Sequence, residues 1–228
     1  MAQVWQKFLT VPHTLLRPYD QWYAWQMYSE LQPYFQDIPL TGSLARDVTA
    51  VLTHHAFPKI AGHVARVAAE AKRLAIQFGA DEDGAETAGW LHDISAIIPD
   101  AARVELCTTF GIPVLPGEAE FPMILHQKLS AVVAQELFGV VDPAVLSAIG
   151  CHTTLKAGAS LLDKIVFIAD KIKWDQPGEP LYLAELETAV THNIDDACRV
   201  YLNYLWQKRD TLRYVHPWFQ AAYEEMTR

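Results

Sequence analysis

The stretch GWLHDI, residues 89–94, places two metal-binding side chains directly after an apolar run. An ionisable side chain is costly to bury unless it is paired or bound to a metal. Successive residues of an α-helix lie about 100° apart around its axis. His92 and Asp93 can therefore approach one ion together only from the edge of a helix or from its last turn. Because Pro99 follows closely, we expect the pair near a helix end.

Four more residues of this kind lie on other stretches that read as apolar helices: His63, His126, His152 and Asp170. A single helical histidine is more often an ordinary core or surface residue than a ligand, and Asp170 has Lys171 and Lys173 as simpler partners. Six candidates on five predicted helical segments instead indicate that the fold brings them together. Imidazole nitrogen and carboxylate oxygen together suit a borderline divalent ion such as Mn, Fe, Co, Ni or Zn.

The chain from residue 43 onward predicts a series of helices. In residues 60–78 the apolar residues recur at helical spacing. The pair Asp142-Pro143 supplies a cap and a first-turn proline, and Ser160 with Asp163 forms a capping box. No alternating strand pattern is present, so the prediction is an all-α fold. The predicted helices span 44–55, 60–78, 81–97, 100–111 and 122–138, begin at 143 and 161, and continue within 181–209 and 217–227, whereas 111–121 reads as a loop.

The composition restricts the class of protein. The chain has 228 residues, 51% of them hydrophobic and 20% charged, which allows a sizeable buried core. Its net charge of −9 argues against nucleic-acid or membrane binding, because both need basic surface. Cys107, Cys151 and Cys198 form no C-x-x-C motif and are typical of reduced thiols in a cytoplasmic protein. We find no signal sequence and no apolar run of the roughly 18 residues that a membrane span needs.

Residues 1–42 differ from residues 43–228, and we treat the first range as an extension and the second as the main domain. An aromatic-rich segment is unfavourable in water, so packing of this extension on the main domain is the favoured interpretation. A dimer contact or a lid over the site is the alternative, and a homodimer is therefore one expected assembly. The aromatic residues of the extension include Trp5, Phe8, Trp22, Tyr23, Trp25, Tyr28, Tyr34 and Phe35.

The order histidine, His-Asp, histidine, histidine, aspartate resembles that of the HD-domain metal-dependent phosphohydrolases. The resemblance covers roughly residues 44–215 and is strongest to the YqeK-like branch, the bacterial symmetrical diadenosine-tetraphosphate hydrolases. It implies an HD-domain helical bundle and the hydrolysis of a nucleotide or dinucleoside polyphosphate, such as diadenosine tetraphosphate to two ADP. The stretches that carry the resemblance are 63–67, 89–94, 125–126, 152–154 and 162–170, of which the last two are the most branch-specific.

The resemblance also implies roles for individual residues. A divalent metal, in the first place iron, with Mn, Co, Ni, Zn or Mg as alternatives, would be held by His63, His92, Asp93 and Asp170. His126 and His152 would face the phosphates or hold a second ion, and Thr153 would contact a nucleotide phosphate. The candidate catalytic residues are therefore Asp93, His126 and His152. Trp174 lies in a following Pro- and Gly-rich loop that either lines the site, with the ring stacking on a base, or simply ends a helix.

Three positions depart from the branch. Its usual lysine after the His-Asp pair is Ala96, its usual arginine after the distal aspartate is Gln176, and its usual glycine after His-Thr-Thr is Leu155. Losing a charge-assisted phosphate contact costs roughly 1.5–3 kcal/mol. We therefore expect an intact metal cage and an incomplete phosphate clamp. The lysines that could compensate are Lys156, Lys171 and Lys173.

The expected function is a metal-dependent phosphohydrolase whose partner is a small phosphorylated substrate. The alternative is a metal- and nucleotide-binding protein without turnover, acting as a sensor or partner-binding module, because Ala96 and Gln176 carry no cation. An oxidative HD-domain enzyme with two irons would require all six candidate ligands to bind metal. A helical protein with incidental histidines would bind none.

Overall fold

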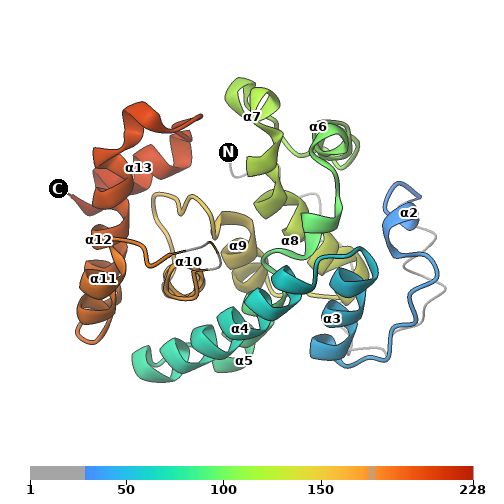
Figure 1. Ribbon diagram of the computed structural model, residues 1–228, viewed down its shortest axis with the longest axis horizontal. Helices are drawn as coiled ribbons and strands as arrows, with labels where there is room; N and C mark the ends of the chain where they lie inside the picture. The colour runs from blue at the N-terminus through green and yellow to red at the C-terminus, as the bar shows by residue number, and fades with distance from the viewer. Residues whose placement is uncertain (1–28, 175, 177, 228) are drawn as a thin grey trace.

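The computed structural model of the protein describes residues 29–174, 176 and 178–227. Every regular element in those ranges is a helix, which confirms the all-α prediction (Figure 1). None of these helices is long and apolar enough to cross a membrane. The elements are α2 (Gln32–Phe35), α3 (Leu44–His54), α4 (Pro58–Phe78), α5 (Glu82–Leu91), η2 (Ile94–Ile97), α6 (Asp100–Thr109), α7 (Pro116–Glu120), η3 (Pro122–Leu125), α8 (His126–Phe138), α9 (Pro143–Cys151), α10 (Leu161–Ile172), α11 (Leu183–Val190), α12 (Ile194–Gln207), η4 (Arg209–Thr211) and α13 (Pro217–Met226).

Helix α10 lies in the middle of the bundle, and α4, α5, α9 and α12 all pack against it (Figure 1). The side chains of residues 165–168 on this helix are completely buried. Burying one large apolar side chain contributes about 1.5–3 kcal/mol, so this run fixes the position of α10 in the core. Asp170 follows on the same helix, and the core therefore determines where its carboxylate lies.

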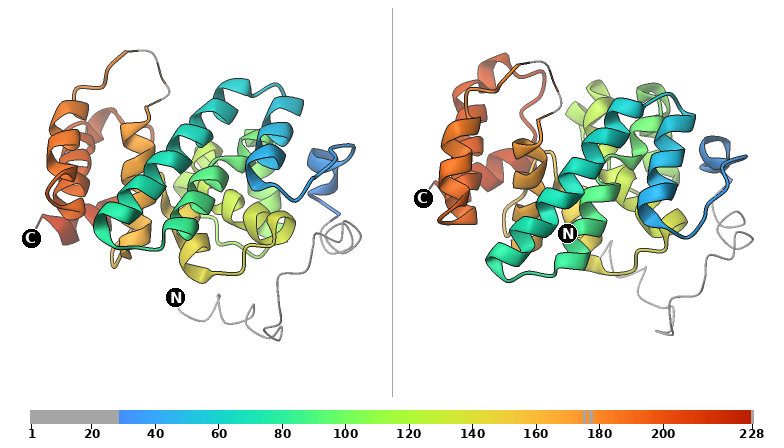
Figure 2. Two further views of the ribbon diagram at one scale, coloured as in Figure 1. Left: turned by 90° about the horizontal axis from the view of Figure 1, so that it is seen from below. Right: turned by 60° about the horizontal axis from the view of Figure 1, so that its bottom comes forward.

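Helices α4 and α5 approach each other closely because Gly89 has no side chain (Figure 2). A Cβ atom at position 89 would lie 2.5 Å from the Cα of Ala68, a distance that no side chain tolerates. The close approach brings the end of α5, where His92 lies, next to His63 on α4. The ring centroids of these two histidines are 5.2 Å apart.

Two helices that the sequence predicts as continuous are divided. The predicted helix 81–97 ends at Leu91 and is followed by the separate 3-10 helix η2. Asp93 lies at this break with φ −110° and ψ 14°, outside the helical region. The predicted helix 122–138 consists of η3 and α8, which meet at His126. Both divisions occur at a candidate site residue, and the apolar pattern does not change at either one. The backbone leaves helical geometry at Asp93, whereas at His126 it stays helical, with φ −56° and ψ −38°, and only the type of helix changes.

The predicted loop 111–121 contains the short helix α7, which corrects that prediction. Pro116 begins this helix, and the Leu115 N–H donates to the Glu118 carboxylate at 2.8 Å. Pro116 at the first position of the helix and Glu118 at the third are ordinary signals for a helix start. In the same stretch, Pro113, Pro116 and Gly117 also read as turn signals, and the sequence alone does not decide between the two.

The predicted starts of α9 and α10 are confirmed. Asp142 accepts a hydrogen bond from the Ala144 N–H at 2.8 Å. Ser160 Oγ accepts from the Asp163 N–H at 3.1 Å, and the Asp163 carboxylate accepts from the Ser160 N–H at 2.8 Å. These caps satisfy backbone donors that have no partner inside the helix.

The described part of the N-terminal extension contacts the core. Leu31, Phe35 and Ile38 are buried among the core residues, so residues 29–38 pack against the main helices. The role of residues 1–42 as a whole stays a prediction, because most of its aromatic residues lie outside the described ranges, including Trp5, Phe8, Trp22, Tyr23, Trp25 and Tyr28.

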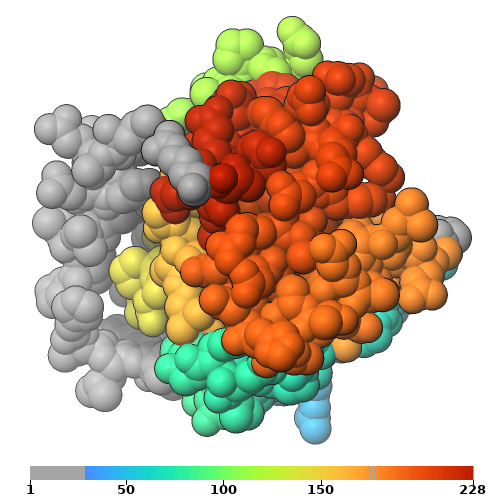
Figure 3. Space-filling view, turned by 90° about the vertical axis from the view of Figure 1, so that its left-hand side faces the viewer, coloured from blue at the N-terminus to red at the C-terminus, as the bar shows by residue number. Residues whose placement is uncertain are grey.

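The aromatic contacts of the described residues gather toward the C-terminus. Trp206 stacks on Tyr223 with ring centroids 4.3 Å apart, and Tyr182 contacts the rings of Tyr201 and Tyr204. Figure 3 shows that the segments from α11 to the C-terminus cover much of this face of the molecule. They enclose α10 from the side opposite α9.

Candidate metal centre

The fold brings all six candidate residues to one place. His63 Nε2 lies 3.3 Å from His92 Nε2, and His126 Nε2 lies 3.1 Å from His152 Nε2. The His92 and His152 rings join these pairs, with centroids 4.7 Å apart. The residues come from α4, the end of α5, the start of α8, the end of α9 and α10: His63, His92 with Asp93, His126, His152 and Asp170.

Main-chain carbonyl groups orient all four imidazole rings. His63 places Nδ1 3.0 Å from the carbonyl oxygen of Lys173, at the end of α10. A carbonyl only accepts, so each Nδ1 carries the proton and each Nε2 faces the cluster. The last carbonyls of a helix lack intrahelical partners, which makes helix ends a ready source of such acceptors. The other three rings use the carbonyl three residues earlier, at 2.7–2.8 Å: His92 with Gly89, His126 with Met123 and His152 with Ile149.

The chemistry of the converging atoms fits a metal ion. Each Nε2 presents a lone pair when Nδ1 is protonated, and the carboxylate oxygens also accept. Acceptors this close repel one another unless a proton or a cation lies between them. Borderline divalent ions take nitrogen and oxygen ligands at about 2.0–2.2 Å. Two sets have ligand atoms within 4.8 Å of one another, and they share His92: His63, His92 and Asp170, and His92, Asp93 and His152.

The protonation states also suit metal binding. Burial alone would raise the pKa of Asp93, but its interactions with His92, His126 and His152 hold this pKa well below its usual value of 3.8. Burial lowers the pKa of His152 from 6.5 to about 4, so this ring is neutral at pH 7. Ionised carboxylates and neutral imidazoles are the forms that bind metal.

Asp170 uses its two carboxylate oxygens differently. Oδ1 lies 3.0 Å from His63 Nε2 and faces the cluster, whereas Oδ2 accepts from the Lys171 ammonium group. Lys171 is itself buried and also donates to the His152 carbonyl at 3.2 Å. Burial would raise the pKa of Asp170, but the charge of Lys171 and the interaction with His63 hold this pKa far below its usual range. The salt bridge considered as the simpler explanation therefore coexists with a metal-facing oxygen.

Thr153 lies where the second pair of histidines meets. Its hydroxyl oxygen is 3.1 Å from His126 Nε2 and 3.0 Å from His152 Nε2. The side chain is partly exposed, so a ligand can reach it. Trp174 is 39% exposed, and its ring packs edge-on against Tyr182 at 6.2 Å. Its stacking on a substrate ring stays a prediction.

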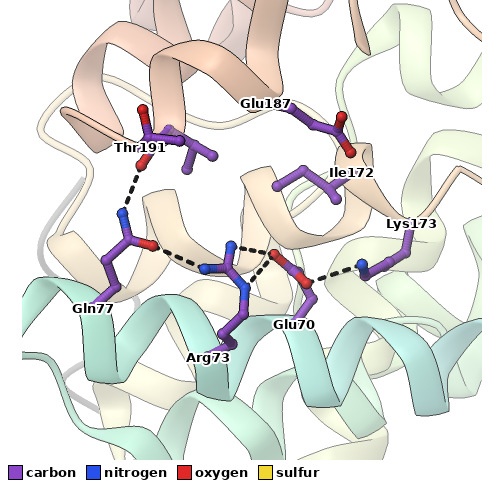
Figure 4. Close-up of a pocket in the computed structure, with 8 residues that line it drawn as sticks. Glu70, Arg73, Gln77, Ile172, Lys173, Glu187 and Thr191 are labelled. Carbon is purple, nitrogen blue, oxygen red and sulfur yellow. Dashed lines mark hydrogen bonds and ion pairs between the residues drawn. The ribbon is translucent and has the colours of Figure 1, made fainter. Parts of the chain in front are cut away.

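A polar pocket of about 260 Å³ lies between α4, the end of α10 and α11 (Figure 4). Glu70 occupies its floor and forms ion pairs with Arg73 at 2.6 Å and Lys173 at 2.9 Å. Burial raises the pKa of Glu70, but the bonds from Arg73 and Lys173 outweigh it and lower this pKa overall. Lys173, whose carbonyl orients His63, is thus also attached to α4 through its ammonium group. Glu70 is not among the residues predicted from the sequence. Its position two helical turns after His63 on α4 places it on the same side of the helix and could have indicated it.

All three lysines that could compensate for the incomplete phosphate clamp are engaged. Lys171 pairs with Asp170 and Lys173 with Glu70, as described above. Lys156 donates to Ser147 at 2.5 Å and lies 3.4 Å from Asp163. Ala96 is half-buried, and its N–H donates to the Asp93 carbonyl at 2.9 Å, so a lysine at that position would begin beside the cluster.

Comparison with known proteins agrees with this arrangement. The HD domain family model matches residues 60–175. A Lactococcus lactis subsp. cremoris protein, described as an uncharacterized protein in the pepC 5′ region, is 43% identical over 139 residues, which are 61% of this chain and 70% of the relative. The symmetrical bis(5′-nucleosyl)-tetraphosphatase of Bacillus subtilis is 32% identical over 111 residues, 49% of this chain and 59% of that enzyme.

A solved structure shows the same arrangement of helices. A predicted HD superfamily hydrolase involved in NAD metabolism, from Clostridium acetobutylicum, superimposes with a TM-score of 0.73 at 27% identity. The match covers 80% of this chain and 96% of that one. The chain belongs to the HD domain family and is an HD-superfamily phosphohydrolase related to the symmetrical bis(5′-nucleosyl)-tetraphosphatases.

Proposed function

We propose that this protein hydrolyses a phosphoanhydride bond of a nucleotide or dinucleoside polyphosphate, with diadenosine tetraphosphate as the first candidate and two ADP molecules as products. The observation that carries the proposal is the convergence of four imidazole Nε2 atoms and two ionised carboxylates at one place. Phosphoryl transfer asks a protein mainly for positioning and charge neutralisation, and such a cluster supplies both. The Bacillus subtilis relative supports the choice of substrate class.

In this proposal the ion is held by His63, His92, Asp93 and Asp170. Iron is the first candidate because of the resemblance to the YqeK-like branch, and Mn, Co, Ni, Zn and Mg are the alternatives. Mixed nitrogen and oxygen ligands suit the borderline ions among them equally. When bound, the ion would polarise a phosphoryl oxygen and lower the pKa of a water molecule. His92 belongs to both sets of ligand atoms, and its single Nε2 lone pair can bind only one ion at a time. The two sets are therefore alternative positions for one ion, and a second ion would have to be held without His92.

The remaining steps fall to side chains at the edge of the cluster. The Asp93 side chain is 21% exposed and its carboxylate is ionised, so it accepts a hydrogen bond from the attacking water and orients it. His126 Nε2 lies 3.3 Å from Asp93 Oδ1. When this ring is protonated at Nε2 as well as at Nδ1, the Nε2 proton can pass to the leaving phosphate. The Thr153 hydroxyl donates to a phosphate oxygen.

Product analysis by chromatography tests the proposal directly. The full chain, loaded with iron or manganese, is incubated with diadenosine tetraphosphate and separately with nucleoside mono-, di- and triphosphates. We expect ADP as the only product from the dinucleotide. Cleavage of a different nucleotide alone would keep the phosphohydrolase and replace the substrate.

Asp93→Ala should remove bound metal and abolish hydrolysis, because it deletes a ligand and the group that orients the water. Metal content is measured by elemental analysis after purification, beside activity. Asp210→Ala changes an 87% exposed carboxylate and is the matched control, which should retain both. Full metal occupancy in Asp93→Ala would contradict the assignment of Asp93 as a ligand.

A metal- and nucleotide-binding protein without turnover is the second candidate. The ion pairs of Lys156 with Asp163 and of Lys173 with Glu70 favour this function. Because both ammonium groups are held in these pairs, neither replaces the positive charge that is missing at Ala96 and Gln176. Bound metal and measurable ADP affinity, with no product from any nucleotide in the panel, would support this second function.

A further inference from the structure

We propose that Gln127 is a positioning residue, which sets the Thr153 hydroxyl at the junction of His126 and His152 and leaves that hydroxyl as the phosphate contact of this segment. The inference rests on the proposed function, because it concerns how the same site recognises phosphate. It assigns a role to a residue that neither the metal-binding pattern nor the predicted phosphate contacts include.

Gln127 is completely buried on α8, directly after His126. A buried amide is costly unless its polar atoms are bonded, and this one is bonded at both ends. Its Oε1 accepts from the N–H groups of Thr153 at 3.1 Å and Thr154 at 3.3 Å. Its Nε2 donates to the Thr154 hydroxyl at 3.2 Å.

These contacts determine which hydrogen-bond donors of the segment after α9 remain available to a ligand. The helix ends at Cys151, and successive N–H groups in the turn that follows could bind an anion if they had no other acceptor. Gln127 already occupies the N–H groups of Thr153 and Thr154, and the Leu155 N–H donates to Cys151 at 2.7 Å. Thr153 instead presents its side chain to the cluster.

The donor and acceptor count at Thr153 then defines its role. A hydroxyl has one proton and can donate to only one of the two Nε2 atoms that lie 3.0 and 3.1 Å away. Once a cation or a proton occupies those lone pairs, the hydroxyl proton is available for a phosphate oxygen. Gln127 holds the backbone of Thr153, and so keeps the hydroxyl within reach of both rings and of the phosphate.

A double-mutant cycle on the full, metal-loaded chain tests this assignment. Thr153→Val and Gln127→Met should each lower kcat/KM for diadenosine tetraphosphate by about tenfold or more, the loss expected for a hydrogen bond to a charged group. The double variant should be no slower than Thr153→Val alone, because Gln127 acts through that hydroxyl. Gln127→Glu keeps the oxygen that accepts both N–H groups and should restore most of the activity. Metal content should stay unchanged throughout.

A purely structural role predicts a different pattern. In that case the effect of Gln127→Met on kcat/KM would multiply with that of Thr153→Val, and the proposal would be overturned. A lower unfolding midpoint of Gln127→Met is expected for either role, because the Thr153 and Thr154 N–H groups lose their acceptor. If the wild type turns nothing over, the proposed function fails. The same cycle is then measured as the Kd for ADP by calorimetry, where non-additive losses at Gln127 and Thr153 would still support the inference. Independent losses, or no ADP binding to the loaded wild type, would overturn it.

Discussion

At the scale of single residues, one local hydrogen bond recurs at three of the four site histidines. Each of these rings lies at a helix boundary and donates from Nδ1 to a carbonyl three residues earlier. The interaction fixes the tautomer that directs Nε2 into the cluster. The same hydrogen bond thus lies at a helix boundary and orients a candidate ligand. The affected residues are His92, His126 and His152.

Restoring the missing cations should raise activity. Ala96→Lys together with Gln176→Arg adds two charges where the related branch has them, and we expect a gain of tenfold or more in kcat/KM on diadenosine tetraphosphate, because each charge-assisted contact contributes roughly 1.5–3 kcal/mol. Steady-state kinetics of the metal-loaded protein measure the gain. Ala184→Lys on the exposed side of α11 controls for added charge alone. An unchanged kcat/KM would place the clamp elsewhere.

At Leu155, which follows His152-Thr153-Thr154, backbone strain and side-chain packing have opposite effects on stability. Its φ of 55° is left-handed, which costs about 1–2 kcal/mol for a residue with a side chain, but the side chain is completely buried. Removing a buried leucine costs about 2–5 kcal/mol, so Leu155→Gly should destabilise the protein despite relieving strain. Ala56→Gly changes an exposed residue with φ 63° and should be neutral or slightly stabilising. Chemical denaturation measures both variants, and a more stable Leu155→Gly would contradict this ranking.

At the scale of elements, the site is assembled where helices end. Helix α5 stops before Asp93, α9 stops before His152, and η3 gives way to α8 at His126. Only α4 and α10 carry site residues within their length, and these two helices pack against each other through the core. A small shift of one helix relative to another would therefore change the distances between the six clustered side chains, even if the helices themselves stay folded.

Gly89→Ala should test this coupling. The added Cβ would lie 2.5 Å from Ala68, so α5 must move away from α4, and overpacking of this kind costs about 1–3 kcal/mol. Because the Gly89 carbonyl also orients His92, we expect weaker metal binding as well as lower stability. Gly150→Ala places its Cβ 3.7 Å from Ala131 and is the matched control, which should be neutral or stabilising. Calorimetric metal titration and denaturation measure the two effects, and unchanged metal affinity in Gly89→Ala would contradict the coupling.

At the scale of the whole molecule, a buried ionic cluster joins the C-terminal segment to the helices beside the site. Glu118 on α7 lies 2.7 Å from Lys128 on α8 and 2.9 Å from His216, which is 98 residues away in the chain. Burial would raise the pKa of Glu118, but the bonds from His216, the Leu115 N–H and Lys128 outweigh it and lower this pKa. The charged form of Glu118 therefore stabilises the folded state.

The pH dependence of stability should report on this cluster. The pKa of Glu118 in the folded state is below its ordinary value of 4.5, so its contribution is fully present above pH 4.5 and is lost as the pH falls through the folded-state pKa. Glu118→Gln should cost about 3 kcal/mol of unfolding free energy at pH 7, the range for breaking a buried charge pair, and less at low pH. Glu120→Gln changes an exposed carboxylate on the same helix and is the control. A loss that does not vary with pH would exclude this linkage.

The sequence by itself determined the helical class, the caps at Asp142 and Ser160, and the six residues of the cluster, because apolar spacing, capping pairs and metal-capable residues are local properties. Only the tertiary structure decided where 81–97 and 122–138 divide, because the apolar pattern continues across both breaks. It also decided that the Lys173 carbonyl orients His63 and that Glu70 pairs with the Lys173 ammonium group. His63 and Lys173 lie 110 residues apart, and no local pattern records such a contact.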